Sequence, residues 1–406
     1  MSIATTDTSS TKMPWALVAA CCLGMFAATA SGSVRSPLLL EMAADFDVSL
    51  PWIANLFGVT SACWAIGSFA AGKASDRIGR RLVLFGALLL LAATMVTVAN
   101  LDHFWLLVIV TAIAGLACGS FTATAMTEVS LRTVSLQHGR ALGWVMSGQS
   151  LTLLIGIPAS AWLGAHVGWR GVHLIVAGLA ILAAVATFLG SRPTRDSKRI
   201  ANAGNSGSVS LREAMTAPIA RLFVALTLER VCFGLSTFYY PTYLSTAYDL
   251  QLAQLAAPLF GFALGNIIGT IVGGQVADRL PNRRVSFALA MLVSGAFAIA
   301  WFGWQPGLVN TVWLGIGFSF FNAVGRPPLI AAMADVPPNV RGVIMGLNSS
   351  IASIGWLSAA MLGGWLYAGP GFDAFGPLML VMCLFAAAVV VPDCRLWKRR
   401  AGSESF

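Results

Sequence analysis

Residues 67–81, GSFAAGKASDRIGRR, form the first stretch whose residue types and spacing could perform chemistry. Gly67 to Lys73 satisfy the Gly, four residues, Gly, Lys pattern of a phosphate-binding loop, which holds nucleotide phosphates. The next position should be Ser or Thr to hold magnesium, and it is Ala74. Such a loop also follows a β-strand, whereas the residues before Gly67 form a long apolar stretch. The pattern therefore does not predict a nucleotide site.

A second set of chemically capable residues lies inside long apolar stretches. Glu229 and Arg230 lie about 15 Å into a stretch that begins near residue 219, at a rise of about 1.5 Å per residue. That depth is the middle of a bilayer, where an ionisable group is costly and marks a candidate functional site. We predict that Glu229 is a protonatable coupling residue and that Arg230 binds substrate or pairs with a carboxylate. An interhelical salt bridge that serves only packing is the alternative. Because adjacent side chains on a helix point about 100° apart, we expect no direct pair between these two.

Arg326 lies in the sequence FNAVGRPPL, in which two prolines remove backbone donors and predict a broken helix. Beside Asn322, this arrangement predicts the wall of a substrate cavity. Snorkelling of Arg326 toward the membrane surface is the alternative. Arg35, Gln149 and Tyr239 are further cavity candidates. Arg35 could equally belong to an outer gate or contact a lipid headgroup. Tyr239 would either stack on a ligand or belong to an interfacial aromatic belt.

The composition excludes an ordinary soluble protein. Of the 406 residues, 57% are apolar and only 10% are charged, and the mean hydropathy is +0.78. Apolar stretches long enough to cross a bilayer as helices recur along the whole chain. We count twelve, at residues 15–40, 51–71, 82–99, 104–126, 141–165, 171–190, 219–246, 256–277, 285–304, 308–332, 342–367 and 375–392. The first follows a polar leader without a cleavage pattern and is interpreted as a membrane helix. The predicted fold is an all-α membrane protein with twelve transmembrane helices.

The positions of the basic residues predict orientation. Of the 25 Lys and Arg residues, 21 fall in segments on one side of the predicted membrane. Positive residues in short loops stay on the cytoplasmic side, so both termini are predicted to be cytoplasmic. The net charge of +9 then reflects topology and anionic lipid, and no basic stripe suggests nucleic-acid binding. The seven cysteines lack metal-ligand spacing, and we predict no metal and no cofactor.

The chain divides into two halves that resemble each other. Residues 191–217 are polar and rich in Arg, Lys, Ser and Asn, which predicts a cytoplasmic linker between residues 1–190 and residues 218–406, the latter with a short basic tail. The Asp76-Arg77 pair recurs 202 positions later as Asp278-Arg279, and Arg140 recurs 201 positions later as Arg341. This offset predicts two pseudo-symmetric six-helix bundles with a site between them.

Residues 72–81, GKASDRIGRR, closely resemble the loop 2–3 signature of the major facilitator superfamily, Gly-x-Leu-Ala-Asp-Arg-x-Gly-Arg-Lys/Arg, with departures at Ala74 and Ser75. A looser copy begins at Gly274 and has Pro281 where the signature has Gly. The resemblance covers the whole chain. It implies a cytoplasmic gate that helps to hold the outward-open state closed on the cytoplasmic side, formed by Gly72, Asp76, Arg77, Gly79, Arg80, Arg81, Gly274, Asp278, Arg279 and Arg283.

Individual residues in and near this gate have specific expected roles. We expect Gly72 to permit close helix approach and Asp76 to cap a helix or pair with an arginine. Near the inner end of the fourth apolar stretch, Glu128 is expected to pair with Arg132 or Arg140.

The fifth apolar stretch partly resembles the Gly- and Pro-rich signature of drug:proton antiporters, at Gly148, Gly156, Pro158 and Gly164. The resemblance implies a twelve-span secondary transporter that exports a small organic solute in exchange for protons across the inner or plasma membrane. It implies that spans 1, 4, 7 and 10 line the cavity. The intramembrane arginines favour an alternative, a permease for uptake or exchange of an organic anion. An intramembrane enzyme is disfavoured, because no His-Glu-x-x-His or Gly-x-Ser-x-Gly motif is present. We expect a monomer whose partners are substrate, protons and lipid.

Overall fold

The computed structural model describes residues 13–133, 137–191, 215–280, 282–303, 307–335 and 338–391, without the side chains of residues 73, 76, 338–343, 345, 346 and 349. The described part is built of helices, and no strand occurs in it. This confirms the all-α prediction. The predicted linker lies largely outside the described residues, and so does the side chain of Asp76.

Helices of the first half follow the apolar stretches closely. They are α1 (Trp15–Ser33), η1 (Ser36–Leu38), α2 (Leu39–Asp45), α3 (Leu50–Ile78), α4 (Arg80–Ala99), α5 (Phe104–Arg132), α6 (His138–Leu151), η3 (Thr152–Gly156) and α7 (Ile157–Gly190). The long α7 reverses at Gly168, whose φ of 69° is a conformation that glycine adopts at little cost. This residue separates the fifth and sixth predicted spans.

The second half repeats the pattern. Its elements are α10 (Ala217–Tyr248), η5 (Leu252–Leu255), α11 (Ala256–Arg279), α12 (Arg283–Gly303), α13 (Leu308–Ala334), α14 (Pro338–Ala368), η6 (Phe372–Ala374) and α15 (Phe375–Val390). The α10 helix contains Pro241 without ending there.

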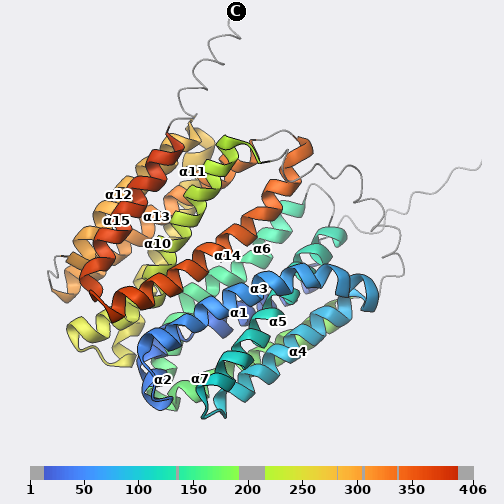
Figure 1. The fold of residues 1–406 in the computed structure, drawn as a ribbon. Helices are drawn as coiled ribbons and strands as arrows, with labels where there is room; N and C mark the ends of the chain where they lie inside the picture. The colour runs from blue at the N-terminus through green and yellow to red at the C-terminus, as the bar shows by residue number, and fades with distance from the viewer. Residues whose placement is uncertain are drawn as a thin grey trace, which may run out of the picture.

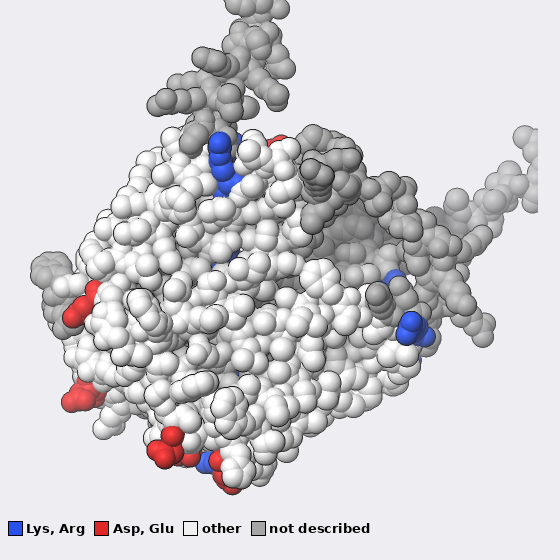
Figure 2. Space-filling model, in the orientation of Figure 1, with Lys and Arg blue, Asp and Glu red and all other residues white. Residues whose placement is uncertain are grey.

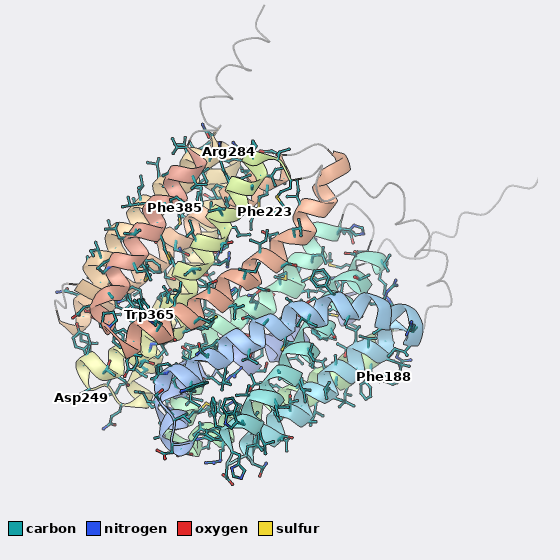
Figure 3. The ribbon with its side chains drawn as sticks, in the orientation of Figure 1. Phe188, Phe223, Asp249, Arg284, Trp365 and Phe385 are labelled. Atoms are coloured by element: carbon teal, nitrogen blue, oxygen red, sulfur yellow. The ribbon has the colours of Figure 1, made fainter. Side chains whose placement is uncertain are left out.

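Ten helical segments of the described chain are long and apolar enough to cross a membrane. One of them, His138–Gly190, contains two predicted spans, and α10 is not among the ten. The count of twelve spans therefore stays a prediction. Large apolar side chains such as Trp365 and Phe385 are exposed on the outside of the second half, where lipid would cover them (Figure 3).

The two halves meet at one end of the molecule and diverge toward the other (Figure 1). We call the end at which α3 begins and α14 ends the far end; there Gly364 of α14 packs against Pro51 of α3. The opposite end, at which α7 ends and α10 begins, is the linker end. On the face seen in Figure 2, the surface between the two ends is almost free of charge, and most visible acidic side chains gather at the far end.

Candidate functional site

A cavity of about 770 Å³ lies between the two halves. Its lining comes from α1, α3, α5, α6, η3 and α7 of the first half and from α10, α11, α13 and α14 of the second. Small-molecule sites typically enclose roughly 300–1,000 Å³, so this cavity can hold a solute of ordinary metabolite or drug size.

Three charged side chains meet at the second-half wall of the cavity. Glu229 of α10 is fully buried, and its Oε1 accepts hydrogen bonds from Nε and Nη2 of Arg326 on α13, both at 3.2 Å. Its Oε2 lies 2.9 Å from Nε of Arg230. The arginine side chains are 12% (Arg230) and 16% (Arg326) exposed, and both line the cavity. The triad carries a net charge of +1 when all three groups are ionised.

The prediction that Glu229 and Arg230 do not pair directly is wrong. The arginine side chain is long enough to bend back around the helix and bring its Nε within ion-pair distance. The divergence of adjacent side chains still shows in the geometry, because Oε2 of Glu229 has no hydrogen-bond partner in the described part of the chain. The carboxylate therefore has one hydrogen-bonded oxygen and one that is held only by charge.

The predicted break in the helix after Arg326 is also wrong. The α13 helix runs without interruption from Leu308 to Ala334 through Pro327 and Pro328. Transmembrane helices tolerate proline because packed neighbours compensate for the freed backbone groups, and Gly273 of α11 gives Pro327 the space to pack closely. The guanidinium of Arg326 bonds Glu229 within the bundle, so snorkelling to the membrane surface does not occur.

Of the other predicted cavity residues, Gln149 lines the cavity, whereas Asn322, Tyr239 and Arg35 are not in its lining. Asn322 lies one turn from Arg326, fully buried, and neither amide atom has a partner in the described part. The Tyr239 hydroxyl donates to the carbonyl of Ala360 at 3.0 Å inside the second half. It therefore neither faces the cavity nor joins an interfacial belt.

Arg35 is buried directly behind the closed end of the cavity. Its Nη2 donates to Oγ1 of Thr60 at 2.8 Å and its Nε to the carbonyl of Gly32 at 3.3 Å. Thr60 and Gly32 themselves line the cavity. With 4% of its surface exposed, Arg35 contacts no lipid headgroup in this state.

Contacts between the halves close the cavity at the far end. The Ser36 hydroxyl donates to the carbonyl of Thr237 at 2.6 Å and contacts that of Phe238 at 3.2 Å. The rings of Phe57 and Phe238 stack with centroids 3.9 Å apart and an interplanar angle of 4°. Trp356 of α14 packs on Phe238 at 5.2 Å. The sequence offered no signal for Ser36, because a lone serine at a helix end has no distinctive pattern.

We expect Ser36→Ala to loosen this closure. Loss of one hydrogen bond removes roughly 0.5–1.5 kcal/mol, which corresponds to a severalfold shift toward states open at the far end. A single cysteine at Ser33, in a background without the native cysteines, reports the shift through its rate of maleimide labelling from the far side. A Ser61→Ala variant is the control, because the Ser61 hydroxyl, in the described part of the chain, donates only within its own helix, to the carbonyl of Phe57. An unchanged labelling rate for Ser36→Ala would show that this bond does not hold the gate.

The first copy of the gate motif forms an ion cluster at the linker end. Glu128 lies 2.5 Å from Arg132 and 3.9 Å from Arg80, which joins α5 to the start of α4. Arg81 donates to the carbonyl of Phe188 at 2.9 Å and lies over its ring. Gly79 connects α3 and α4 with a φ of 89°. The expected pairing of Glu128 with Arg132 is confirmed.

The second copy is built differently. Arg283 pairs with Asp335 of α13 at 2.6 Å and donates to the carbonyl of Ala277 at 3.3 Å. The motif residues Asp278 and Arg279 are exposed, as is Arg77 in the first copy.

Within the described part of the chain, the motif glycines Gly72 and Gly274 do not bring two helices close together. A Cβ added at Gly72 or Gly274 would meet nothing within 4 Å. The expectation for Gly72 is therefore wrong. Close approach occurs instead at Gly67 and Gly119, where α3 and α5 cross and an added Cβ would lie 2.2 and 2.0 Å from a backbone oxygen.

Sequence reasoning missed much of the neutral cavity wall. Trp64 on α3 and Trp356 on α14 line the cavity, as do Thr122 of α5 and Met146 of α6. Their residue types are common in membrane helices, and only rotation of each helix about its axis separates a cavity-facing position from a lipid-facing one.

Comparison with known proteins identifies the family. The family model of the Major Facilitator Superfamily matches residues 21–348 and, in an overlapping match, residues 222–404. The chain is 26% identical over 340 residues to a chloramphenicol resistance protein of Streptomyces lividans, covering 80% of this chain and 84% of the relative. It is 25% identical over 363 residues to the purine ribonucleoside efflux pump NepI of Salmonella enteritidis, covering 87% of each. It is 25% identical over 358 residues to the multidrug resistance protein MdtG of Proteus mirabilis, covering 84% of this chain and 83% of the relative.

A solved structure shares the fold. It is the crystal structure of a bacterial homolog of the human lysosomal transporter Spinster, in an inward-facing and occupied conformation, with a TM-score of 0.77 and 15% identity over 95% of this chain and 98% of that one. The family match extends across both halves of the chain, and the structure places a cavity between them. The chain belongs to the Major Facilitator Superfamily of multi-pass membrane transporters.

Proposed function

We propose that the protein is a secondary active carrier that exports a small organic solute by alternating access, in exchange for protons. The supporting geometry is a solute-sized cavity between the halves that is closed at the far end by Ser36, Phe57 and Phe238. Relatives whose names describe efflux or resistance support export.

We propose that the linker end faces the cytoplasm of a plasma or inner membrane. The distribution of Lys and Arg supports this orientation, because basic residues collect in cytoplasmic loops. The far end carries several acidic side chains, among them Asp45 and Asp102, which both pair with Arg170. In this orientation the cavity is closed toward the outside, and anionic lipid surrounds the basic end of the protein. We further propose that the carrier acts as a monomer.

The buried Glu229 carboxylate is the single observation that carries proton coupling. When ionised, it ties α10 to α13 through Arg326. A proton on Glu229 removes the charge that holds these helices together. Thr237 and Phe238, which close the far end, lie two turns further along α10, about 12 Å away at about 1.5 Å per residue. The protonatable Glu229 and the residues that close the far end thus lie on one helix, α10. A movement of α10 on protonation of Glu229 can therefore reach the closure at the far end.

Transport by the full-length protein in proteoliposomes tests this proposal. The names of the relatives supply the first two substrates, chloramphenicol and a purine ribonucleoside. We expect an imposed pH gradient to drive saturable accumulation of a labelled substrate against its gradient and a protonophore to abolish it. Flux that does not saturate, or accumulation that ignores the pH gradient, would contradict proton-coupled carriage.

A second candidate function is a permease for an organic anion. One observation favours it: Arg230 and Arg326 are the charged side chains in the described lining of the cavity, and both are cations. Adding an organic anion to the substrate panel separates the two candidates.

A further inference from the structure

Arg230 and Arg326 have hydrogen-bond donors that no contact in the described part of the chain uses. Arg230 contacts Glu229 through its Nε, and Arg326 donates to Glu229 from its Nε and Nη2. No contact within the described chain engages the two terminal nitrogens of Arg230 or Nη1 of Arg326, and none of the three is a buried atom without a partner. Because both arginines line the cavity, these nitrogens form a set of charged donors open to a bound solute.

The rest of the described cavity wall is neutral. Acidic side chains are absent from it, and Glu229 is shielded behind the two arginines with none of its surface exposed. A solute in the cavity therefore meets positive charge on the second-half wall and no compensating negative charge elsewhere. Guanidinium groups bind carboxylates and similar anions through paired, charge-assisted hydrogen bonds.

The remaining lining suits a flat apolar body. Trp64 and Trp356 line the cavity from α3 and α14, and Phe233 of α10 lies under the guanidinium of Arg326 at 4.8 Å. Aromatic side chains pack well against planar rings. An anionic group at the arginines thus places the body of the solute between aromatic walls.

A further cation lies beyond the closed end of the cavity. Arg35 is buried without an Asp or Glu within ion-pair distance in the described part of the chain, and its Nη1 has no partner there. Burying an unpaired charge is costly. An anion passing toward the far end would meet this cation next.

From these observations we propose that the substrate is a small organic anion with a planar apolar body, held by Arg230 and Arg326, and that it binds together with a proton on Glu229. The anion and the Glu229 carboxylate compete for the same two cations. A proton on Glu229 removes that competition, so anion and proton favour one another and move in the same direction. In the described part of the chain, the other titratable group beside Glu229 is the Cys232 thiol, which contacts Cys383 of α15; the charged groups are the two arginines.

This inference rests on the second candidate function, the organic-anion permease, and it replaces the exchange of solute for protons with their movement in one direction. Binding can be measured without transport, so the ligand class is tested separately. The probes are 1-naphthoate, 1-naphthamide and 1-naphthylmethylammonium, which share one planar body and differ in charge. Titration calorimetry of the purified full-length protein measures their affinities at pH 6 and pH 8. We expect naphthoate to bind at least tenfold more tightly than the amide, a difference of 1.4 kcal/mol, to bind more tightly at pH 6, and to take up protons from the buffer. The ammonium probe should not compete.

Three variants distinguish a binding role from a structural one. Arg326→Gln should weaken naphthoate binding at least about tenfold, and Arg326→Lys should recover part of the loss. Glu229→Gln should bind naphthoate at least as tightly as the unmodified protein and lose the pH dependence, which a triad that serves only packing would not do. Arg170→Gln, at the far end, is the matched control and should leave the affinity unchanged.

Several results would overturn the proposal. Equal or tighter binding of the amide or the ammonium probe would exclude an anion site, and so would the absence of naphthoate binding. Loss of naphthoate binding in a folded Glu229→Gln variant would exclude the competition between carboxylates. Binding of naphthoate without its transport in proteoliposomes would instead count against the carrier function and leave the ligand class standing.

Discussion

The Glu229→Gln variant is expected to lose all proton-driven transport of solute while it continues to exchange solute across the membrane. Glutamine keeps the size of the side chain and its carbonyl acceptor for Arg326, but it cannot gain or lose a proton. Gradient-driven accumulation in proteoliposomes should fall to the level of protein-free liposomes. Counterflow, which needs only the alternation of the carrier, should stay within about twofold of the unmodified rate.

The control for this experiment is Asp102→Asn, which removes a carboxylate from a surface ion pair with Arg170. Exposed ion pairs contribute little to stability, about 0–1 kcal/mol, so the control should keep both activities. Coupling that survives in Glu229→Gln would reject the role of this residue. Loss of both accumulation and counterflow, in a variant that keeps its melting temperature, would assign Glu229 to the conformational change and not to proton binding.

The second large effect is expected at the crossing of α3 and α5. A Cβ added at Gly119 would lie 2.0 Å from the carbonyl oxygen of Trp64 and 2.8 Å from the backbone nitrogen of Ser68. Neither backbone atom can move without displacing α3, so Gly119→Ala must push the two helices apart. Such overpacking costs typically about 1–3 kcal/mol. We expect the melting temperature of the purified protein, followed by intrinsic fluorescence, to fall by several degrees.

Gly86→Ala in α4 is the matched control, because a Cβ there meets nothing within 4 Å. Alanine is a better helix former than glycine by about 1 kcal/mol, so this variant should melt at the same temperature as the unmodified protein or higher. Equal melting of both variants would show that the α3–α5 contact tolerates a wider separation than the structure indicates.

Much of the fold was predictable because lipid imposes a strong and local rule. A helix that crosses a bilayer needs about 20 apolar residues, so the predicted span 104–126 lies within α5 and the predicted span 82–99 lies within α4. The same rule made Glu229, Arg230 and Arg326 stand out, because charge inside such a span is costly.

Predictions failed where they depended on contacts between helices. Pro327 and Pro328 were expected to break α13, but the neighbouring α11 leaves space for Pro327 and the helix continues. Asn322 was expected in the cavity wall and Tyr239 either there or in an interfacial belt, but both lie buried in the interior of the second half. Gly72 was expected at a helix crossing because of its motif, whereas the close crossing uses Gly67 and Gly119.

The sequence by itself therefore determined that the chain is an all-helical membrane protein with charged residues inside its spans, because hydropathy and the cost of buried charge act residue by residue. Only the tertiary structure decided that Glu229 joins both arginines, that Arg35 lies behind the cavity and that Ser36 closes the far end. Those facts depend on how each helix is rotated and which neighbour it meets. Rotation and neighbours are set by packing over the whole bundle, which no single segment encodes.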